Sequence, residues 1–507
     1  GSKTSETEDT DKTVDTLKEC EMSEFNKKSR KRNAVILSGM GMLNQVVSNL
    51  AAFIYRTVFI YWLSIEYLGI NGLFSNIIQI FSLAELGIGS VIVYRLYKPI
   101  KEDDVEKTAA YMHFYQRFYQ LMAVLILIVG VLVAPVLKYV IHDAEVPRDI
   151  NIYVVYALYI IQSATSYLFA YRQTLLDADQ KGYINTAVQM VFTCTKYVAS
   201  IIVLYFTRNY TLVLAIGIII NLLGNIWIYV YVSHSYSDVF QSTGRLSRAE
   251  IFQIYKDTGA MLCHRIGSTV VTSTDNIVMS MYVGTVAVGI YSNYYMIIQI
   301  IQNVMNNLLG GSTSSIGNHT LSVKNEERYN LFKRLRFVNM WISVFCTCSL
   351  YLLMNPFIQI VWGENLVFPK EIVIILCANF FLTSSRIVNG AFSNATGMFV
   401  YDKARPLIEA TLNLVISVLL AQKIGVTGVF LGTIISSGLT VWWREPFLLY
   451  KRVFERSSIP YFLTYVFWMV LIFMVSIPLE MFFNRIPVNV TFLVVRFLIC
   501  GFGINLF

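Results

Sequence analysis

Apolar stretches recur along this chain from residue 34 to its end, each long enough to form one membrane-crossing helix. Such a helix needs about 20 apolar residues to cross a hydrocarbon layer about 30 Å thick. The approximate limits of the fourteen stretches are 34–62, 71–95, 110–137, 151–171, 184–206, 211–232, 257–282, 286–310, 337–355, 371–395, 406–421, 425–443, 460–482 and 488–507. Only 14% of the residues are charged, against about 25% in a soluble domain. The sequence therefore predicts an all-α polytopic membrane protein with about 14 transmembrane helices.

The distribution of Lys and Arg predicts the orientation of these spans. With the N-terminus in the cytoplasm, the inside connections hold about four times as many basic residues as the outside ones, as the positive-inside rule requires. This bias accounts for the net charge of +8 without any nucleic-acid partner. We expect residues 1–32 to form a disordered cytoplasmic tail, acidic at first and then basic.

An internal repeat predicts how the spans are grouped. The sequence GLFSN begins at Gly72 in the second span, and GIYSN begins at Gly289 in the eighth. The repeats are six spans apart, so they share one topology, and parallel repeats are typical of transporters. We therefore predict an N-lobe at 33–240, a cytoplasmic linker at 241–256, a C-lobe at 257–450 and an accessory helix pair at 451–507. Chance similarity between two apolar helices is the alternative.

Polar residues inside several spans are three, four or seven residues apart, the spacing that places side chains on one helix face. The candidates for a polar cavity lining that contacts sugar are Gln45, Asn49, Gln79, Thr272, Gln299, Asn303 and Asn306. Any single one of them could instead form an interhelical hydrogen bond. Their recurrence on the leading helices of both predicted lobes favours a shared hydrated cavity.

Charged residues within the spans are candidates for function, because a charge in the bilayer core is costly. The cationic candidates for an anion site are Arg56, Arg265, Lys196 and Arg386. Arginine suits a diphosphate because its planar fork makes two charge-assisted bonds. The carboxylates Asp275 and Glu85 are candidates for ion coupling, with Na⁺ or H⁺ as the ion. Structural ion pairs are the alternative for all of these residues.

Enzyme signatures are weak in this sequence. Asp177 and Asp179 match the short acidic motif with which glycosyltransferases hold a metal and a nucleotide sugar, but they lie in a connection too short for a catalytic domain. A polar turn that ends a helix is the simpler interpretation. The sequence contains no P-loop motif. We predict that the chain is not an enzyme and holds no cofactor.

Three stretches resemble the polysaccharide-unit (Wzx-like) flippases of the multidrug/oligosaccharidyl-lipid/polysaccharide (MOP) exporter superfamily. They are residues 67–99 with the sequence LAELGIGS from Leu83, residues 274–293 with Asp275 and GIYSN, and residues 175–181. The resemblance extends over essentially everything after residue 30. Its motifs are typical of the family and do not identify the sugar.

The resemblance implies a multi-pass protein of the bacterial inner membrane. Its function would be to move an undecaprenyl-pyrophosphate-linked oligosaccharide repeat unit to the outer leaflet by alternating access, for capsule or exopolysaccharide assembly. Upstream glycosyltransferases, a downstream polymerase and membrane lipids are the implied partners. A flippase for lipid II-type or teichoic-acid precursors, or an ion-coupled multidrug exporter on the same fold, is the alternative.

Overall fold

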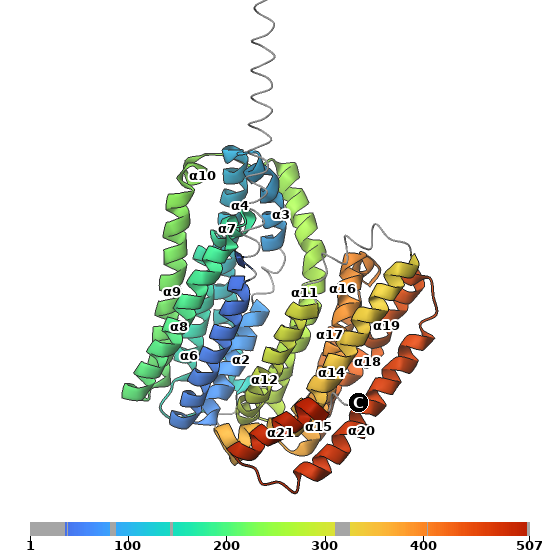
Figure 1. The fold of residues 1–507 in the computed structure, drawn as a ribbon. Helices are drawn as coiled ribbons and strands as arrows, with labels where there is room; N and C mark the ends of the chain where they lie inside the picture. The colour runs from blue at the N-terminus through green and yellow to red at the C-terminus, as the bar shows by residue number, and fades with distance from the viewer. Residues whose placement is uncertain are drawn as a thin grey trace, which may run out of the picture. The chain divides into compact units, whose positions relative to one another are not determined.

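The computed structural model of the protein describes residues 36–37, 39–81, 88–141, 146–309, 325–402 and 404–503. The side chains of residues 260–272, 399–400 and 502–503 lie outside this description. The regular structure of the described ranges is helical (Figure 1). A helix lies within each of the fourteen predicted spans, which confirms the prediction of an all-α polytopic chain.

The helices follow the predicted spans closely. In the first half they are a helix over 39–62, α2 (Ile65–Phe81), α3 (Ile88–Lys101), α4 (Val105–Val133), α6 (Ile152–Ala170), α7 (Gln173–Ala178), α8 (Gly182–Thr207), α9 (Tyr210–Ser235) and α10 (Ser237–Gln241). In the second half they are α11 (Arg248–Tyr282), α12 (Thr285–Leu309), α14 (Asn325–Trp362), α15 (Lys370–Ser384), α16 (Ile387–Ala395), α17 (Arg405–Ile424), α18 (Val426–Leu439), α19 (Val441–Leu449), α20 (Ile459–Phe483) and α21 (Val490–Gly503).

Two predicted spans are divided between two helices at described residues, and a third, at 71–95, contains the end of α2 and the start of α3. The span at 371–395 is divided between α15 and α16 at Ser385 and Arg386, and the span at 425–443 is divided between α18 and α19 at Thr440. Discontinuous helices of this kind often border substrate or ion sites in transporters. Part of the predicted linker is also helical, because α11 begins at Arg248.

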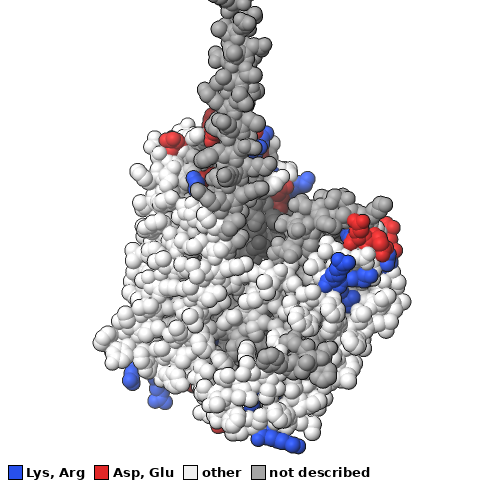
Figure 2. Space-filling model, in the orientation of Figure 1, with Lys and Arg blue, Asp and Glu red and all other residues white. Residues whose placement is uncertain are grey.

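The surface of the helices is suited to lipid. Within the described residues, nine helices are long and apolar enough to cross a membrane. In Figure 2 the Lys, Arg, Asp and Glu side chains gather near helix ends, and uncharged side chains cover the flanks between them. The protein is therefore a multi-pass membrane protein.

The chain divides into two compact units that differ from the predicted lobes. Unit 1 comprises residues 1–56, 88–127 and 161–258, and unit 2 comprises residues 57–87, 128–160 and 259–507. The second span, which we placed in the N-lobe, therefore contributes α2 to unit 2. The lobe boundaries stay predictions.

The repeated motif forms a close helix contact inside unit 2, where α2 packs on α12. A Cβ atom added to Gly69 would lie 2.0 Å from the carbonyl oxygen of Thr285. A Cβ atom added to Gly289 would lie 2.6 Å from the carbonyl oxygen of Ile65. Small residues let helix backbones approach closely in membranes. The first glycine of the second copy, Gly289, thus lies at the close approach, whereas a Cβ atom added to the first glycine of the first copy, Gly72, would meet the Val288 side chain at 3.2 Å.

The accessory pair α20 and α21 packs on α14 in unit 2. Buried Arg336 of α14 donates hydrogen bonds of 2.8 Å to the carbonyl oxygen of Tyr461 and to Thr464 Oγ1. Its guanidinium also lies 3.7 Å from the centre of the Tyr461 ring. Arg496 of α21 is buried and donates to the carbonyl oxygens of Phe483 and Ile486, where α20 ends. These two arginines fix the pair to α14 and fix the turn between its helices.

Candidate functional site

The helix over 39–62 has a polar face and an apolar face, both in unit 1. Gln45, Asn49 and Arg56 are half-buried on the polar face. The exposed apolar side chains that recur on the other side are Met42, Leu43, Val46, Leu50 and Ile54. This arrangement agrees with the predicted stripe, because the exposed face is suited to lipid and the polar residues are turned toward other helices.

Arg56 and Lys196 meet around a pair of tyrosines in unit 1. The rings of Tyr55 and Tyr197 are 5.2 Å apart. The ammonium group of Lys196 lies 4.8 Å from the centre of the Tyr197 ring, and Arg56 has Tyr197 and Tyr55 as electrostatic neighbours. Two cations on separate hydrophobic helices thus lie beside one aromatic ring. We call Arg56, Lys196, Tyr55 and Tyr197 the cationic cluster.

A second set of predicted polar residues lies on α2 and α12 of unit 2. Gln79 is exposed, and its Oε1 atom accepts a hydrogen bond of 3.2 Å from Ser273 of α11. Gln299 is half-buried, and both Asn303 and Asn306 are exposed. Exposed amides on a membrane helix need water or a polar ligand, because lipid cannot satisfy their hydrogen bonds.

Asp275 is buried in unit 2 among polar side chains of α17 and α18. We call Asp275, Asn413 and Thr433 the Asp275 cage. Its Oδ2 atom accepts a 3.0 Å hydrogen bond from Thr433 of α18. Asn413 of α17 donates to the same Thr433 hydroxyl at 2.9 Å. Ser417, one turn further along α17, donates to the carbonyl oxygen of Val429 at 3.0 Å. The other carboxylate oxygen, Oδ1, is buried and has no hydrogen-bond partner among the described residues.

The cage around Asp275 has the chemistry of a site for a small cation. It presents the Asp275 carboxylate of α11 and the Thr433 hydroxyl of α18, oxygen ligands of the kind that hard cations prefer, while the Asn413 amide nitrogen of α17 donates to Thr433. A buried carboxylate oxygen that lacks a hydrogen bond is costly unless a proton or a cation satisfies it. No cluster of three or more His, Cys, Asp and Glu residues that could hold a metal occurs in the described part of the chain.

Arg386 lies in a different environment from the cationic cluster. It precedes α16, and its Nε atom donates to Glu445 of α19 at 3.0 Å, with both side chains largely buried. A second network lies on neighbouring elements of the same unit, where Arg405 binds Asp402 at 2.5 Å and Glu409 at 2.8 Å. Arg386 therefore has the partner expected of a structural ion pair, and its role as an anion ligand stays a prediction.

The side chains of three predicted site residues lie outside the part of the chain that the structure describes. Glu85 lies outside the described residues. Arg265 and Thr272 belong to α11, but their side chains fall within the range 260–272 that the structure does not describe. Their proposed roles stay predictions.

The Asp177-x-Asp179 motif forms a polar turn. Asp179 follows the last residue of α7 and accepts a 2.5 Å hydrogen bond from the Tyr236 hydroxyl. Lys181 pairs with the same carboxylate at 2.7 Å. Burial and the hydrogen bond to Asp179 raise the pKa of Tyr236 well above its ordinary value. Asp179 thus joins the end of α7 to the end of α9. This agrees with the interpretation of the motif as a polar turn that ends a helix.

The sequence did not identify some of these neighbours. Glu445 carries no signal of its own, because it lies just after a predicted span and beside another charged residue, Arg444. Thr433 is one hydroxyl among many in the membrane. Asn413 and Ser417, in contrast, are four residues apart on one helix face, a spacing that singles them out.

The comparisons with solved structures show the fold. A structure described as the lipid II flippase MurJ, inward closed, has a TM-score of 0.63 and 13% identity, covering 93% of this chain and 97% of that one. An inward-facing MATE family multidrug transporter of the MOP superfamily has a TM-score of 0.58 and 15% identity, with coverage of 80% and 95%. The Vibrio cholerae MATE transporter VcmN has a TM-score of 0.55 and 13% identity, with coverage of 84% and 98%. The chain therefore has the fold of the MOP superfamily transporters.

The family follows from the sequence itself. Residues 32–313 match the family described as polysaccharide biosynthesis protein. The chain belongs to this family, which confirms the resemblance to the polysaccharide branch of the MOP superfamily. No curated protein matches the chain.

Proposed function

We propose that the protein is a flippase that moves an undecaprenyl-pyrophosphate-linked oligosaccharide repeat unit from the cytoplasmic to the outer leaflet of the bacterial inner membrane. It would do so by alternating access, with the N-terminus cytoplasmic, for capsule or exopolysaccharide assembly. The family match supports a role in polysaccharide biosynthesis. The observation that carries the choice of substrate is the cationic cluster of Arg56 and Lys196 beside Tyr197.

The cationic cluster is suited to a diphosphate. Two like charges within hydrophobic helices repel each other and are costly to desolvate. A diphosphate would neutralise both, with Arg56 binding two of its oxygens through the guanidinium fork and Lys196 adding a point charge. The hydroxyls of Tyr55 and Tyr197 could donate further hydrogen bonds. Arg265 stays a separate candidate for an anion ligand.

The polar residues that we propose as sugar contacts would select a hydrophilic headgroup. In unit 1, Gln45 and Asn49 share a helix face with Arg56. In unit 2, the exposed amides of Asn303 and Asn306 offer donors and acceptors that suit sugar hydroxyls.

We propose the cage around Asp275 as the site of the coupling ion. Sodium would be held by the Asp275 carboxylate with the hydroxyl oxygen of Thr433, which Asn413 holds in place, whereas a proton would reside on Oδ1. Because α11, α17 and α18 all contribute, occupancy would change how tightly these helices pack. Glu85 stays a second candidate for ion coupling.

The alternatives differ in the ligand that they need. A lipid II-type or teichoic-acid precursor flippase would use the same diphosphate chemistry, and one structure with a similar fold is described as a lipid II flippase. A multidrug exporter would hold an organic cation, and two other similar structures are described as MATE transporters. Two cations beside one tyrosine pair favour the anionic substrate. A transporter role also leaves no catalytic residue to assign, and glycosyltransferases and a polymerase remain the proposed partners.

Native mass spectrometry of the purified protein would test the substrate class. The probes are a polyprenyl-diphosphate oligosaccharide, the polyprenyl monophosphate and an organic-cation drug. We expect preferential retention of the diphosphate glycolipid, and we expect the double variant Arg56→Ala/Lys196→Gln to lose it. Retention of the drug in preference to the glycolipid would assign the protein to the exporter branch and overturn the proposal.

A further inference from the structure

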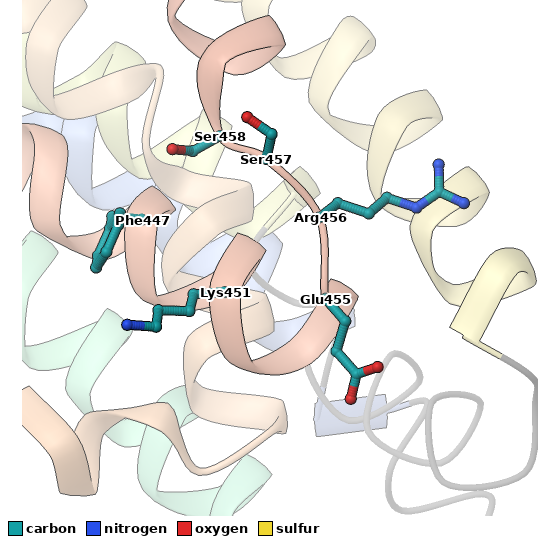
Figure 3. Close-up of a pocket in the computed structure, with 6 residues that line it drawn as sticks. All are labelled: Phe447, Lys451, Glu455, Arg456, Ser457 and Ser458. Atoms are coloured by element: carbon teal, nitrogen blue, oxygen red, sulfur yellow. The ribbon is translucent and has the colours of Figure 1, made fainter.

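A pocket lies where the chain enters the accessory helix pair in unit 2. It is between the π-helix η7 (Tyr450–Phe454) and the start of α20, and its volume is about 500 Å³. The residues that line it are Phe447, Lys451, Glu455, Arg456, Ser457 and Ser458 (Figure 3). By the positive-inside bias, this end of α20 faces the cytoplasm.

The backbone turns sharply at the pocket, and the turn presents the two serines. Glu455 has a φ of 54°, a left-handed conformation that ends η7. The Arg456 N–H then donates to the carbonyl oxygen of Tyr450 at 2.9 Å. Ser458 immediately precedes α20, but its side chain makes no capping hydrogen bond. Its hydroxyl can therefore bind a ligand without giving up a contact that holds the helix.

Lys451 is the cation that the pocket offers. Its ammonium group lies 5.5 Å from the centre of the Phe447 ring, and no carboxylate pairs with it among the described residues. Arg456 extends to the other side (Figure 3), where it pairs with Glu326 and lies 4.4 Å from the Tyr329 ring. The Glu455 carboxylate also points away from Lys451 in this view.

The electrostatic surroundings of the pocket are basic. The charged residues of η7, the turn and residues 325–336 of α14, which packs on η7, are Arg328, Lys333, Arg334, Arg336, Lys451, Arg452 and Arg456 on the positive side, and Glu326, Glu327 and Glu455 on the negative side. Basic residues directly cytoplasmic of a membrane helix attract anionic lipids, and basic pockets between helices bind their headgroups.

An exposed apolar face begins beside the pocket and runs along α20. The exposed large apolar side chains on α20 include Ile459, Leu463, Val466, Phe467, Val470, Phe473, Met474 and Ile477. Their spacing of three, four and seven residues places them on one side of the helix. The first of them directly follows Ser458. A cationic, hydroxyl-lined pocket thus adjoins an apolar stripe, as a phospholipid with a headgroup and acyl chains requires.

We propose that this pocket binds the headgroup of an anionic phospholipid of the cytoplasmic leaflet, with its acyl chains along the exposed face of α20. Lys451 would bind the phosphate, and the hydroxyls of Ser457 and Ser458 would donate to its oxygens. A phosphate ion would use only the polar part, whereas a phospholipid uses both parts. This site shares no residue with the cationic cluster. It would bind phospholipid whichever glycolipid the protein transports.

Native mass spectrometry of the delipidated full-length protein tests the proposal. Phosphatidylglycerol is titrated against phosphatidylcholine with the same acyl chains, in wild type and in Lys451→Gln. Lys423→Gln is the matched control, because Lys423 is also an exposed lysine of unit 2 but lies at the end of α17. We expect Lys451→Gln to weaken phosphatidylglycerol binding about fivefold, as for one juxtamembrane charge, and Lys423→Gln to leave it unchanged. Ser458→Ala should weaken it by a smaller factor.

Three outcomes would overturn the proposal. Equal phosphatidylglycerol binding in wild type and Lys451→Gln would remove Lys451 from any lipid site. Competition by millimolar inorganic phosphate in wild type but not in Lys451→Gln would make the pocket a phosphate site. Loss of the diphosphate glycolipid but not of phosphatidylglycerol in Lys451→Gln would make it part of the substrate path.

Discussion

Arg56 and Arg386 are both arginines within hydrophobic helices, but their neighbours differ. Arg386 in unit 2 pairs with Glu445 at 3.0 Å, and the charges of that pair cancel. Arg56 in unit 1 lies beside Tyr55 and Tyr197, and Lys196 adds a second positive charge next to Tyr197. The surroundings of the two arginines thus differ: a carboxylate lies beside Arg386, and two tyrosines with a second cation lie beside Arg56.

The largest expected effect comes from breaking the ion pair. Arg386→Met leaves Glu445 buried and uncompensated, which costs about 3–5 kcal/mol in comparable buried pairs. We expect a large fall in the thermal unfolding midpoint of the detergent-solubilised protein, measured without substrate.

The double variant Arg386→Met/Glu445→Met is the control for that experiment. It removes both charges, so it should recover most of the lost stability. If Arg386→Met unfolds at the wild-type temperature and instead loses glycolipid binding, Arg386 is a ligand and the contrast with Arg56 disappears.

In the cationic cluster, we expect a substitution to lower substrate affinity and to leave stability unchanged. Arg56→Ala removes hydrogen bonds to a charged group worth about 1.5–3 kcal/mol, so affinity for the diphosphate glycolipid should fall about 10- to 150-fold. The thermal unfolding midpoint without substrate should stay close to that of wild type. Titration by native mass spectrometry gives the affinity.

Arg56→Lys sharpens this test. Lysine keeps the charge but loses the planar fork, so we expect an affinity between those of wild type and Arg56→Ala. An affinity equal to wild type in Arg56→Ala, with a large loss of stability, would make Arg56 a structural residue like Arg386.

Asp275 is an intramembrane carboxylate, and its proposed ligand is a cation where that of Arg56 is an anion. If the cage holds sodium, saturating sodium should stabilise the protein by about 2.7 kcal/mol at 100 times the dissociation constant. We expect wild type to show a rise in unfolding temperature when sodium replaces potassium, and Asp275→Asn to show none.

Asn413→Ala should also reduce the response to sodium. Thr411→Val on the same helix should retain it, because the Thr411 hydroxyl is exposed and donates only to the carbonyl oxygen of Leu407. A sodium response of equal size in Asp275→Asn would exclude this cage as the sodium site. A response to pH in place of sodium, lost in the same variants, would assign a proton.

The smallest effect is expected at the uncharged contact between α2 and α12. Gly289→Ala places a Cβ atom 2.6 Å from the carbonyl oxygen of Ile65, and overpacking of this kind costs about 1–3 kcal/mol. Gly438→Ala is the matched control, since nothing lies within 4 Å of its added Cβ atom. A lower thermal unfolding midpoint in Gly289→Ala alone would show that the repeat motif serves packing, whereas equal midpoints would contradict it.

The sequence predicted much of the fold because membrane helices carry their own signals. Hydropathy predicted spans that each contain a helix in the structure, and Gly289 of the repeat lies at the contact between α2 and α12. The breaks at Arg386 and Thr440 were not predicted, because both lie inside apolar stretches of adequate length. The polar stripe of Gln45, Asn49 and Arg56 was predicted from spacing alone.

The partners of the charged residues could not be predicted in the same way. Spacing reports which residues share a helix face, but Arg386 and Glu445 lie on different helices. Nothing in the two apolar spans indicates that α16 packs on α19. The same holds for Asp275 and Thr433, which are 158 residues apart. Tertiary packing decides which intramembrane charges lie beside a carboxylate, and spacing along one helix does not report it.

A translocation assay tests the central claim most directly. The purified protein is placed in liposomes that contain a polyprenyl-diphosphate oligosaccharide with a fluorescent label on the sugar, and a membrane-impermeant quencher reports transfer between leaflets. The account predicts rapid transfer with wild type, and transfer at the rate of protein-free liposomes with Arg56→Ala/Lys196→Gln. Transfer by wild type no faster than in protein-free liposomes, or undiminished transfer by the double variant, would contradict it.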